Sequence, residues 1–277
     1  MGEGAWFVTK KLGVTEWYLP VSGPAAVRLC KKLGLDGMQM TDLGGSERNY
    51  PLLDERVEEL FLEELDGTDF TIYTLHPLEI ARNPGIQFDI KSSIGQKTLE
   101  IYKKTVETCV RYHIPTIMLA SFAGSKFQNR YELGQTMHTL NEYSKIAQAD
   151  GVRLIYEGFS DTETMLRIYE ETGSVKLCYD LANPHLFGFS EPKKDIAAFG
   201  KERIDCIHVK DCSEEMNRTC LLGEGVTDVA QSLKWMRHMG FDGWYFLETH
   251  YNERPLADVG HGLDALLADA AFVREHW

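Results

Sequence analysis

Four short runs in the second half of the chain share one form, and their sequences are RLIYE (153–157), KLCYD (176–180), IDCIHV (204–209) and WYFLE (244–248). Most positions in them are apolar or aromatic, which is typical of strands that are buried on both faces. Each run also ends on or next to a side chain that can bind a metal ion. These side chains are Glu157, Asp180, His208 and Glu248. The pattern predicts a scaffold that brings four strand ends together.

Helical periodicity fills the segments between these runs, and the same alternation extends toward the N-terminus. The strands predicted around the four runs cover 152–159, 175–181, 204–209 and 243–249. Further strands are predicted at 36–42, 69–78 and 114–121, with a weaker first strand at 6–8. The predicted helices cover 24–32, 52–65, 95–113, 131–150, 162–171, 193–199, 228–239 and 263–275. Strands that alternate regularly with helices form parallel sheets that the helices cover.

This alternation predicts an α/β fold, a single (β/α)₈ TIM barrel with eight parallel strands, in which residues 1–277 form one domain. An open, doubly wound sheet is the competing architecture. It would carry a GxGxxG or GxxxxGK(S/T) signature after an early strand, and the sequence contains neither. Because catalytic groups in barrels come from the C-terminal ends of strands, we expect the active site at the ends of strands five to eight.

The net charge of the chain, −13 at pH 7, argues against several kinds of partner. So acidic a surface repels the phosphate groups of nucleic acids and of anionic membranes. Six cysteines are scattered without a CxxC pair, which is typical of reduced thiols. The sequence shows neither a signal-peptide pattern nor an apolar run of membrane-spanning length. We therefore expect a cytoplasmic protein that binds neither nucleic acid nor membrane.

Side-chain alternation along a strand decides whether the four ligands can meet. His208 and Lys210 share one face of their strand, as Phe246 and Glu248 share one face of theirs. If these faces point into the barrel, the ligands converge at its mouth. Three carboxylates packed together repel one another, and a divalent cation removes that cost. Hard oxygen ligands without a thiolate favour Mn²⁺, with Mg²⁺ or Co²⁺ as alternatives.

Such a centre predicts chemistry beside a carbonyl group. Four protein ligands in an octahedral sphere leave two positions free for adjacent oxygens of a substrate. The cation then polarises the carbonyl and stabilises the enediolate that forms when the neighbouring C–H proton leaves. Glu157 and Glu248 come from strands on opposing sides of the predicted barrel mouth. They can therefore act as base and acid on opposite faces of a sugar.

The motifs YEG, YDLAN, IHVKD and LETHY resemble those of the sugar phosphate isomerase/epimerase superfamily. That group shares the xylose-isomerase-like barrel with ketose 3-epimerases, inosose dehydratase and endonuclease IV. The resemblance implies that Glu157, Asp180, His208 and Glu248 hold the metal, as the last four strands do in the ketose 3-epimerases. It also implies that Glu157 and Glu248 are the catalytic acid/base pair. A small-molecule carbohydrate substrate follows from it, and a homo-oligomer by analogy.

The chain departs from the epimerase pattern close to the metal ligands. Those epimerases have a His three residues after the metal Asp, where this chain has Asn183, and His185 follows two positions later. Arg218 only approximately matches their substrate-binding Arg. Lys210 looks more like inosose dehydratase, where a lysine can bind or protonate a leaving oxygen. Together with His76, which ends the third predicted strand, these residues are the candidates for substrate binding.

Plainer structural roles compete with these assignments. His76 can simply cap its strand, and Lys210 can form a salt bridge with Asp211 or Glu224. A single acidic residue at a strand end is more often a helix cap or a loop hydrogen-bonder. Four potential ligands at successive strand ends nevertheless favour a metal site.

The sequence leaves four functions open. The first is a metal-dependent isomerase or epimerase of a ketose or related carbohydrate. The second is a lyase or dehydratase that uses the same site on a keto-sugar, a keto-inositol or an oxidised glycoside and expels a β-substituent. The third, a DNA-repair endonuclease, needs several metal-binding histidines and a basic groove, which the acidic charge opposes. The fourth is a non-catalytic binding protein, which would not exchange substrate protons with solvent.

Overall fold

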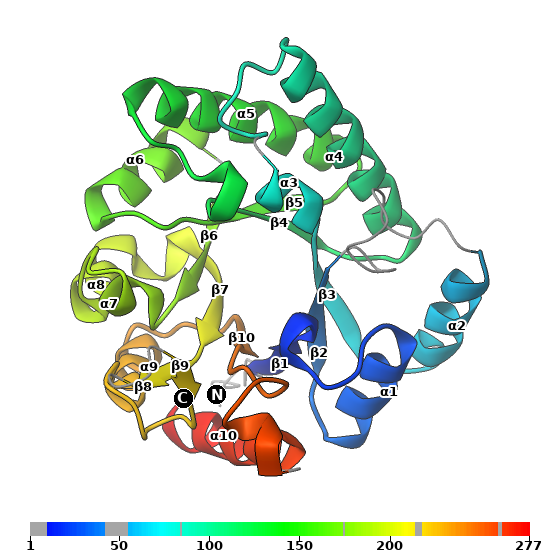
Figure 1. The fold of residues 1–277 in the computed structure, drawn as a ribbon, viewed down its shortest axis with the longest axis vertical. Helices are drawn as coiled ribbons and strands as arrows, with labels where there is room; N and C mark the ends of the chain where they lie inside the picture. The colour runs from blue at the N-terminus through cyan, green and yellow to red at the C-terminus, as the bar shows by residue number, and fades with distance from the viewer. Residues whose placement is uncertain (1–9, 42–54, 84, 174, 214–217, 260–261) are drawn as a thin grey trace, which may run out of the picture.

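Eight parallel strands close into a barrel, and helices surround it (Figure 1). The structure is a computed structural model that describes residues 10–41, 55–83, 85–173, 175–213, 218–259 and 262–277. The barrel strands are β1 (Lys11–Thr15), β2 (Gly37–Thr41), β3 (Thr71–His76), β4 (Thr116–Ala120), β5 (Arg153–Glu157), β6 (Lys176–Asp180), β7 (Ile204–Val209) and β10 (Trp244–Leu247). Their order around the barrel is β1-β10-β7-β6-β5-β4-β3-β2. The predicted barrel is confirmed, whereas the assignment of residues 1–277 to one domain stays a prediction.

The outer ring consists of helices that follow the strands in sequence (Figure 1). The longer ones are α1 (Pro24–Lys32), α2 (Glu55–Leu65), α4 (Ser93–Arg111), α5 (Arg130–Ala149), α6 (Thr162–Thr172), α8 (Pro192–Arg203), α9 (Val229–His238) and α10 (Gly262–His276). Shorter pieces are α3 (Leu78–Arg82), α7 (Asn183–Leu186) and the 3₁₀ turns η1 (Glu16–Tyr18), η2 (Ala123–Ser125) and η3 (Leu256–Val259). Within the described residues, no helix has the length and apolar character needed to cross a membrane.

Some local predictions differ from the structure. The expected strand at 6–8 lies outside the described residues, and the first described strand is β1, a few residues later. The short helix α3 is not among the predicted helices, since a helix of five residues is too short to show periodicity. The connection after β7 contains a small antiparallel hairpin of β8 (Asp211–Ser213) and β9 (Arg218–Cys220).

Large side chains fill the barrel interior on the side away from the site. Tyr73, Cys206 and Phe246 belong to a compact apolar cluster there. The ring of Phe246 stacks on that of Trp244, with centroids 5.3 Å apart. Gly13 makes room for it, since a Cβ atom at this position would lie 2.4 Å from the Phe246 ring. The interior is therefore a packed core, and the polar strand ends stand at the mouth.

The buried carboxylate of Asp211 organises the loop after β7. Its oxygens accept hydrogen bonds from the backbone N–H groups of Cys212, Gly223, Gly225 and Thr227 and from the Thr227 hydroxyl. Gly225 has to be glycine here, because a Cβ atom would lie 2.2 Å from Asp211 Oδ1. The loop is thus tied to the end of β7.

Candidate metal centre

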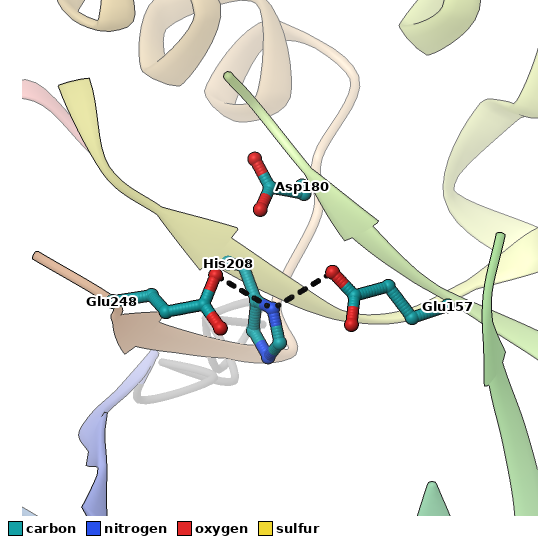
Figure 2. A group of neighbouring side chains, drawn as sticks. All are labelled: Glu157, Asp180, His208 and Glu248. Carbon is teal, nitrogen blue, oxygen red and sulfur yellow. Dashed lines mark ion pairs between the residues drawn. The ribbon is translucent and has the colours of Figure 1, made fainter. Parts of the chain in front are cut away.

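The four predicted ligands meet at the C-terminal mouth of the barrel, and each comes from a different strand or strand end (Figure 2). Glu157, Asp180, His208 and Glu248 each offer a ligand atom, and these atoms all lie within 4.8 Å of one another. All four residues are buried. In Figure 2, Glu157 and Glu248 approach the His208 ring from opposite sides, and Asp180 lies beside them. The register of neighbouring strands brings these residues together. Asp180 on β6 pairs with His208 on β7. On the other side of β7, His208 pairs with Phe246, which lies two residues before Glu248.

The two ring nitrogens of His208 have different surroundings. Nε2 lies 2.7 Å from Gln39 Oε1 and is hydrogen-bonded to it. Nδ1 points to the carboxylates, 3.5 Å from Glu157 Oε1 and 3.3 Å from Glu248 Oε2, but it has no hydrogen-bond partner among the described residues. A buried nitrogen that faces two carboxylates without a hydrogen bond is suited to bind a cation.

Asp180 is held by the turn that follows its own strand. Its Oδ1 accepts hydrogen bonds from the backbone N–H groups of Ala182, at 2.7 Å, and Asn183, at 2.9 Å. Its Oδ2 lies 2.7 Å from Lys210 Nζ. The first oxygen is therefore fixed by backbone donors, and the second faces the shared charge cluster.

Lys210 is the cation that balances this cluster in part. Nζ also lies 2.9 Å from Glu248 Oε2. Burial lowers the pKa of Lys210, but the charges of Asp180 and Glu248 more than offset this and hold the pKa well above its usual value. The salt bridge with Asp211 or Glu224, the structural alternative for Lys210, does not form, because the ammonium group pairs with Asp180 and Glu248 instead.

The two glutamates differ in their environments. Burial would raise the pKa of Glu248, but His208 and Lys210 hold it well below its usual value. Its Oε1 accepts a hydrogen bond from Trp17 Nε1 at 3.2 Å. Burial raises the pKa of Glu157, and the charge of His208 offsets this only in part. Glu157 Oε1 accepts a weak hydrogen bond from Asn183 at 3.3 Å, and Oε2 accepts none from the described residues.

The donor set fits a divalent cation. Three carboxylates and one imidazole are buried together with a single lysine, so negative charge is in excess. Without a cation the two glutamates raise the pKa of His208 although burial lowers it. A raised pKa favours a second ring proton, on Nδ1, and a cation bound at Nδ1 would take the place of that proton. Hard oxygen donors and one nitrogen are the ligands that such ions use. The cluster is therefore a possible divalent-metal site.

A cavity of about 490 Å³ opens beside the cluster, which is within the range of about 300–1,000 Å³ typical of small-molecule sites. Glu157 and Glu248 line it, together with the predicted substrate ligands His76, Asn183 and Lys210. Trp17, Phe122, Phe159 and Phe187 also line it. The cavity thus has a charged part at the strand ends and an aromatic wall.

The remaining predicted substrate ligands are His185, Arg218 and His76. His185 lies on α7 with an exposed side chain and is not among the lining residues. Arg218 begins β9, and its side chain lies outside the described part of the structure. His76 lies in the wall, where its Nδ1 donates to the Met118 carbonyl at 2.9 Å. Burial lowers the pKa of His76 to about 4, so the ring is neutral and Nε2 is an acceptor.

The sequence-based prediction missed two residues that contact the ligands. Trp17 lies in η1, the turn that directly follows β1, and a correct placement of that strand would have put it at the barrel mouth. Gln39 is a buried polar residue within the apolar run GMQMT of β2. A buried amide needs hydrogen-bond partners, and a polar residue within an apolar run was therefore the signal that could have revealed a role for Gln39.

Comparisons with known proteins agree with this geometry. The family model described as xylose isomerase-like TIM barrel matches residues 27–275. A 2-epi-5-epi-valiolone 7-phosphate 2-epimerase from Actinoplanes sp. is 26% identical over 238 residues, which cover 83% of each chain.

Two solved structures show the same fold. The IolI protein with a bound zinc atom superposes with a TM-score of 0.77 at 16% identity, over 96% of this chain and 99% of its own. D-psicose 3-epimerase from Clostridium cellulolyticum H10, solved with D-tagatose, superposes with a TM-score of 0.72 at 13% identity, over 96% and 99%. The relatives named as epimerases support the expected enzyme class. Since the family model spans most of the sequence, the chain belongs to the xylose isomerase-like TIM barrel family.

Proposed function

We propose that the chain is a divalent-metal-dependent epimerase or isomerase that acts on a ketose or a related carbohydrate. The observation that carries the proposal is the buried cluster of Glu157, Asp180, His208 and Glu248 beside a cavity of about 490 Å³. The similarity to a named 2-epimerase and a named 3-epimerase supports the same class of reaction. Mn²⁺ is our proposed ion, because the donors are mainly carboxylate oxygens.

The arrangement of the two glutamates suits transfer of a proton across a carbon atom. A divalent cation, when bound, supplies positive charge beside substrate oxygens that gain negative charge as a C–H proton is removed. Glu157 and Glu248 stand on opposite sides of the His208 ring (Figure 2). One carboxylate takes the proton from the carbon beside the carbonyl, which leaves an enediolate. The other, which starts in its protonated form, gives its proton to the opposite face and becomes a carboxylate, and the configuration is inverted.

The free oxygen of Glu157 leaves it open to exchange a proton with the substrate. Oε2 accepts no hydrogen bond from the described residues, and Glu157 lines the cavity. Both oxygens of Glu248 already have donors, from Trp17 and Lys210. Hydroxyl groups of the substrate would then bind to His76 Nε2 and to the amide of Asn183, which lie in the same wall.

A lyase or dehydratase is the second candidate, and Lys210 is the observation that supports it. Its ammonium group lines the cavity and lies 2.9 Å from Glu248 Oε2. A charged donor at this place can protonate a β-oxygen as its bond to carbon breaks. The same proton abstraction would then end in loss of water or of an aglycone. The cavity thus allows both outcomes, and the product separates them.

The test is a panel of ketoses, keto-inositols and oxidised glycosides, each incubated with the protein and Mn²⁺ in D₂O and analysed by mass spectrometry. An epimerase or isomerase gives a product whose mass changes only by exchanged deuterium. Loss of water or of an aglycone identifies the lyase. On the substrate found, we expect Glu157→Gln and Glu248→Gln to lose most of the activity, while the exposed Glu163→Gln keeps it. Full activity in both cluster variants would refute the proposed mechanism.

A further inference from the structure

A row of polar side chains crosses the otherwise apolar barrel interior next to the metal cluster. Gln39 on β2, Thr74 on β3 and Thr116 on β4 occupy matching positions, since Gln39 pairs with Thr74 and Thr74 pairs with Thr116 in the strand register. All three residues are 0% exposed. A buried amide or hydroxyl without a hydrogen bond costs roughly 1–3 kcal/mol in proteins. The hydrogen bonds of this row therefore need a complete account.

The row has a fixed direction, because it ends on a carbonyl oxygen that can only accept. Thr116 Oγ1 donates to the backbone carbonyl of Tyr73 at 2.5 Å, which uses its single hydroxyl hydrogen. Thr116 Oγ1 also lies 2.8 Å from Thr74 Oγ1 and must accept the hydrogen of that contact. Thr74 then has only lone pairs left, and it accepts from Gln39 Nε2 at 3.4 Å. The orientation of the Gln39 amide follows from this order.

The same donor-to-acceptor order of hydrogen bonds continues to His208. Gln39 Nε2 also lies 3.5 Å from Cys206 Sγ, a weak acceptor, which agrees with the same amide orientation. Gln39 Oε1 consequently faces His208 Nε2 at 2.7 Å. An amide oxygen only accepts, so Nε2 has to carry a hydrogen. In a neutral imidazole the lone pair is then on Nδ1, the nitrogen that faces the two glutamates.

We propose that Gln39, Thr74 and Thr116 form a positioning relay that fixes the tautomer of His208 and presents its Nδ1 lone pair to the cation. This inference rests on the proposed metal site. In the reverse tautomer an N–H group would point at the cation, and His208 Nε2 and Gln39 Oε1 would face each other as two acceptors. Mutation of the residue that hydrogen-bonds the other ring nitrogen of a metal-binding histidine typically weakens metal affinity by about 10–100-fold.

Thr116→Val is the decisive variant, because it alters the relay two side chains away from His208. Valine has nearly the shape of threonine but no hydroxyl. Thr74 can then turn its hydrogen toward Gln39, and the amide can turn over and present N–H to His208 Nε2. That change moves the imidazole hydrogen to Nδ1 and opposes metal binding. Thr116→Ser keeps the hydroxyl and should restore the wild-type behaviour.

The matched control is Thr105→Val. Thr105 is also 0% exposed, but its hydroxyl donates only within α4, to the Ile101 carbonyl at 2.9 Å. Metal affinity is measured by calorimetric titration of the metal-free proteins with Mn²⁺. We expect Gln39→Leu to weaken binding about 10–100-fold. Thr116→Val should weaken it several-fold, and Thr116→Ser and Thr105→Val should bind as the wild type does.

A second measurement separates the relay from the metal site. In protein with ¹⁵N-labelled histidine, NMR shows which ring nitrogen of His208 carries the hydrogen, with Mg²⁺ or without metal. The relay predicts a hydrogen on Nε2 and a bare Nδ1 in the wild type, both with Mg²⁺ bound and, without metal, at a pH high enough to make the ring neutral. If the wild type binds no divalent ion, the proposed function fails, while this spectrum still tests the relay. A bare Nε2 overturns the relay, as does wild-type metal affinity in Thr116→Val.

Discussion

Replacement of Lys210 by methionine should destabilise the metal-free protein by about 3–5 kcal/mol. Nζ lies 2.7 Å from Asp180 Oδ2 and 2.9 Å from Glu248 Oε2, and all three residues are buried. Methionine keeps most of the volume and the apolar stem but removes the charge. Two carboxylates then stay buried beside Glu157 without their counter-ion. Removal of one partner of a buried ion pair is costly for this reason.

The charge interactions of Lys210 with Asp180 and Glu248 support that magnitude. Two unit charges 4 Å apart at an effective dielectric constant of about 20 attract each other by roughly 4 kcal/mol. Lys210 has two such contacts at shorter range, and burial of the ammonium group opposes them. The attraction dominates, because the pKa of Lys210 is held well above its usual value despite burial. A loss of 3–5 kcal/mol corresponds to a fall in Tm of roughly 6–20 °C for a domain near this size.

Urea unfolding with EDTA measures this loss, and the matched control is Lys145→Met. Lys145 pairs with Glu142 on the surface of α5, where such pairs contribute about 0.3–0.5 kcal/mol. Addition of Mn²⁺ should then stabilise Lys210→Met more than the wild type, because the ion supplies positive charge that the variant lacks. At 100 times its Kd a bound ion adds about 2.7 kcal/mol. Lys210→Met within 1 kcal/mol of the wild type in EDTA would refute the electrostatic account of the cluster.

Three further changes test the scaffold and its titration. Burial lowers the pKa of His76 from 6.5 to about 4, so the folded state binds fewer protons between these values. This difference in pKa contributes about 3 kcal/mol to the free energy of unfolding, which is present above pH 6.5 and is lost as pH falls toward 4. In urea unfolding at pH 7 and 4.5, His76→Asn should lose this part of the pH dependence. Gly13→Ala should lower the free energy of unfolding by about 1–3 kcal/mol, because its Cβ would lie 2.4 Å from the Phe246 ring. The control Gly134→Ala in α5 meets no atom within 4 Å and should raise the free energy of unfolding by about 0.4–1 kcal/mol in the same assay. Asp211→Ala leaves the loop donors unpaired, so hydrogen exchange of the Gly223, Gly225 and Thr227 amides should accelerate, and unchanged exchange would contradict the role of Asp211.

The metal cluster was predictable because each ligand has a local signature. Glu157, Asp180 and Glu248 end or follow apolar runs, and parallel strands in a barrel place such ends at one mouth. Nothing beyond the regular alternation of strands and helices is needed for that inference. The same local logic did not reveal β1 at the N-terminal side, and the strand predicted at 6–8 lies outside the described residues. Trp17 therefore did not stand at a strand end, and its hydrogen bond to Glu248 was missed.

The relay was not predictable because it depends on register between strands. Gln39, Thr74 and Thr116 are separated by long segments of sequence, and each looks like an isolated polar residue in an apolar run. Only the pairing of β2 with β3 and of β3 with β4 places them side by side. Register is set by packing of the whole barrel, which no single segment reveals.

The partner of Lys210, by contrast, was open to a sharper argument from sequence. Successive side chains of an extended strand point to opposite faces, so Lys210 and Asp211 cannot both point into the barrel. His208 points inward as a ligand, and Lys210, two residues on, has to follow it. Asp211 then points outward, where it binds the loop amides instead of the lysine. Alternation alone therefore excludes the adjacent carboxylate and leaves the ligands of the neighbouring strands, Asp180 and Glu248, as the partners within reach.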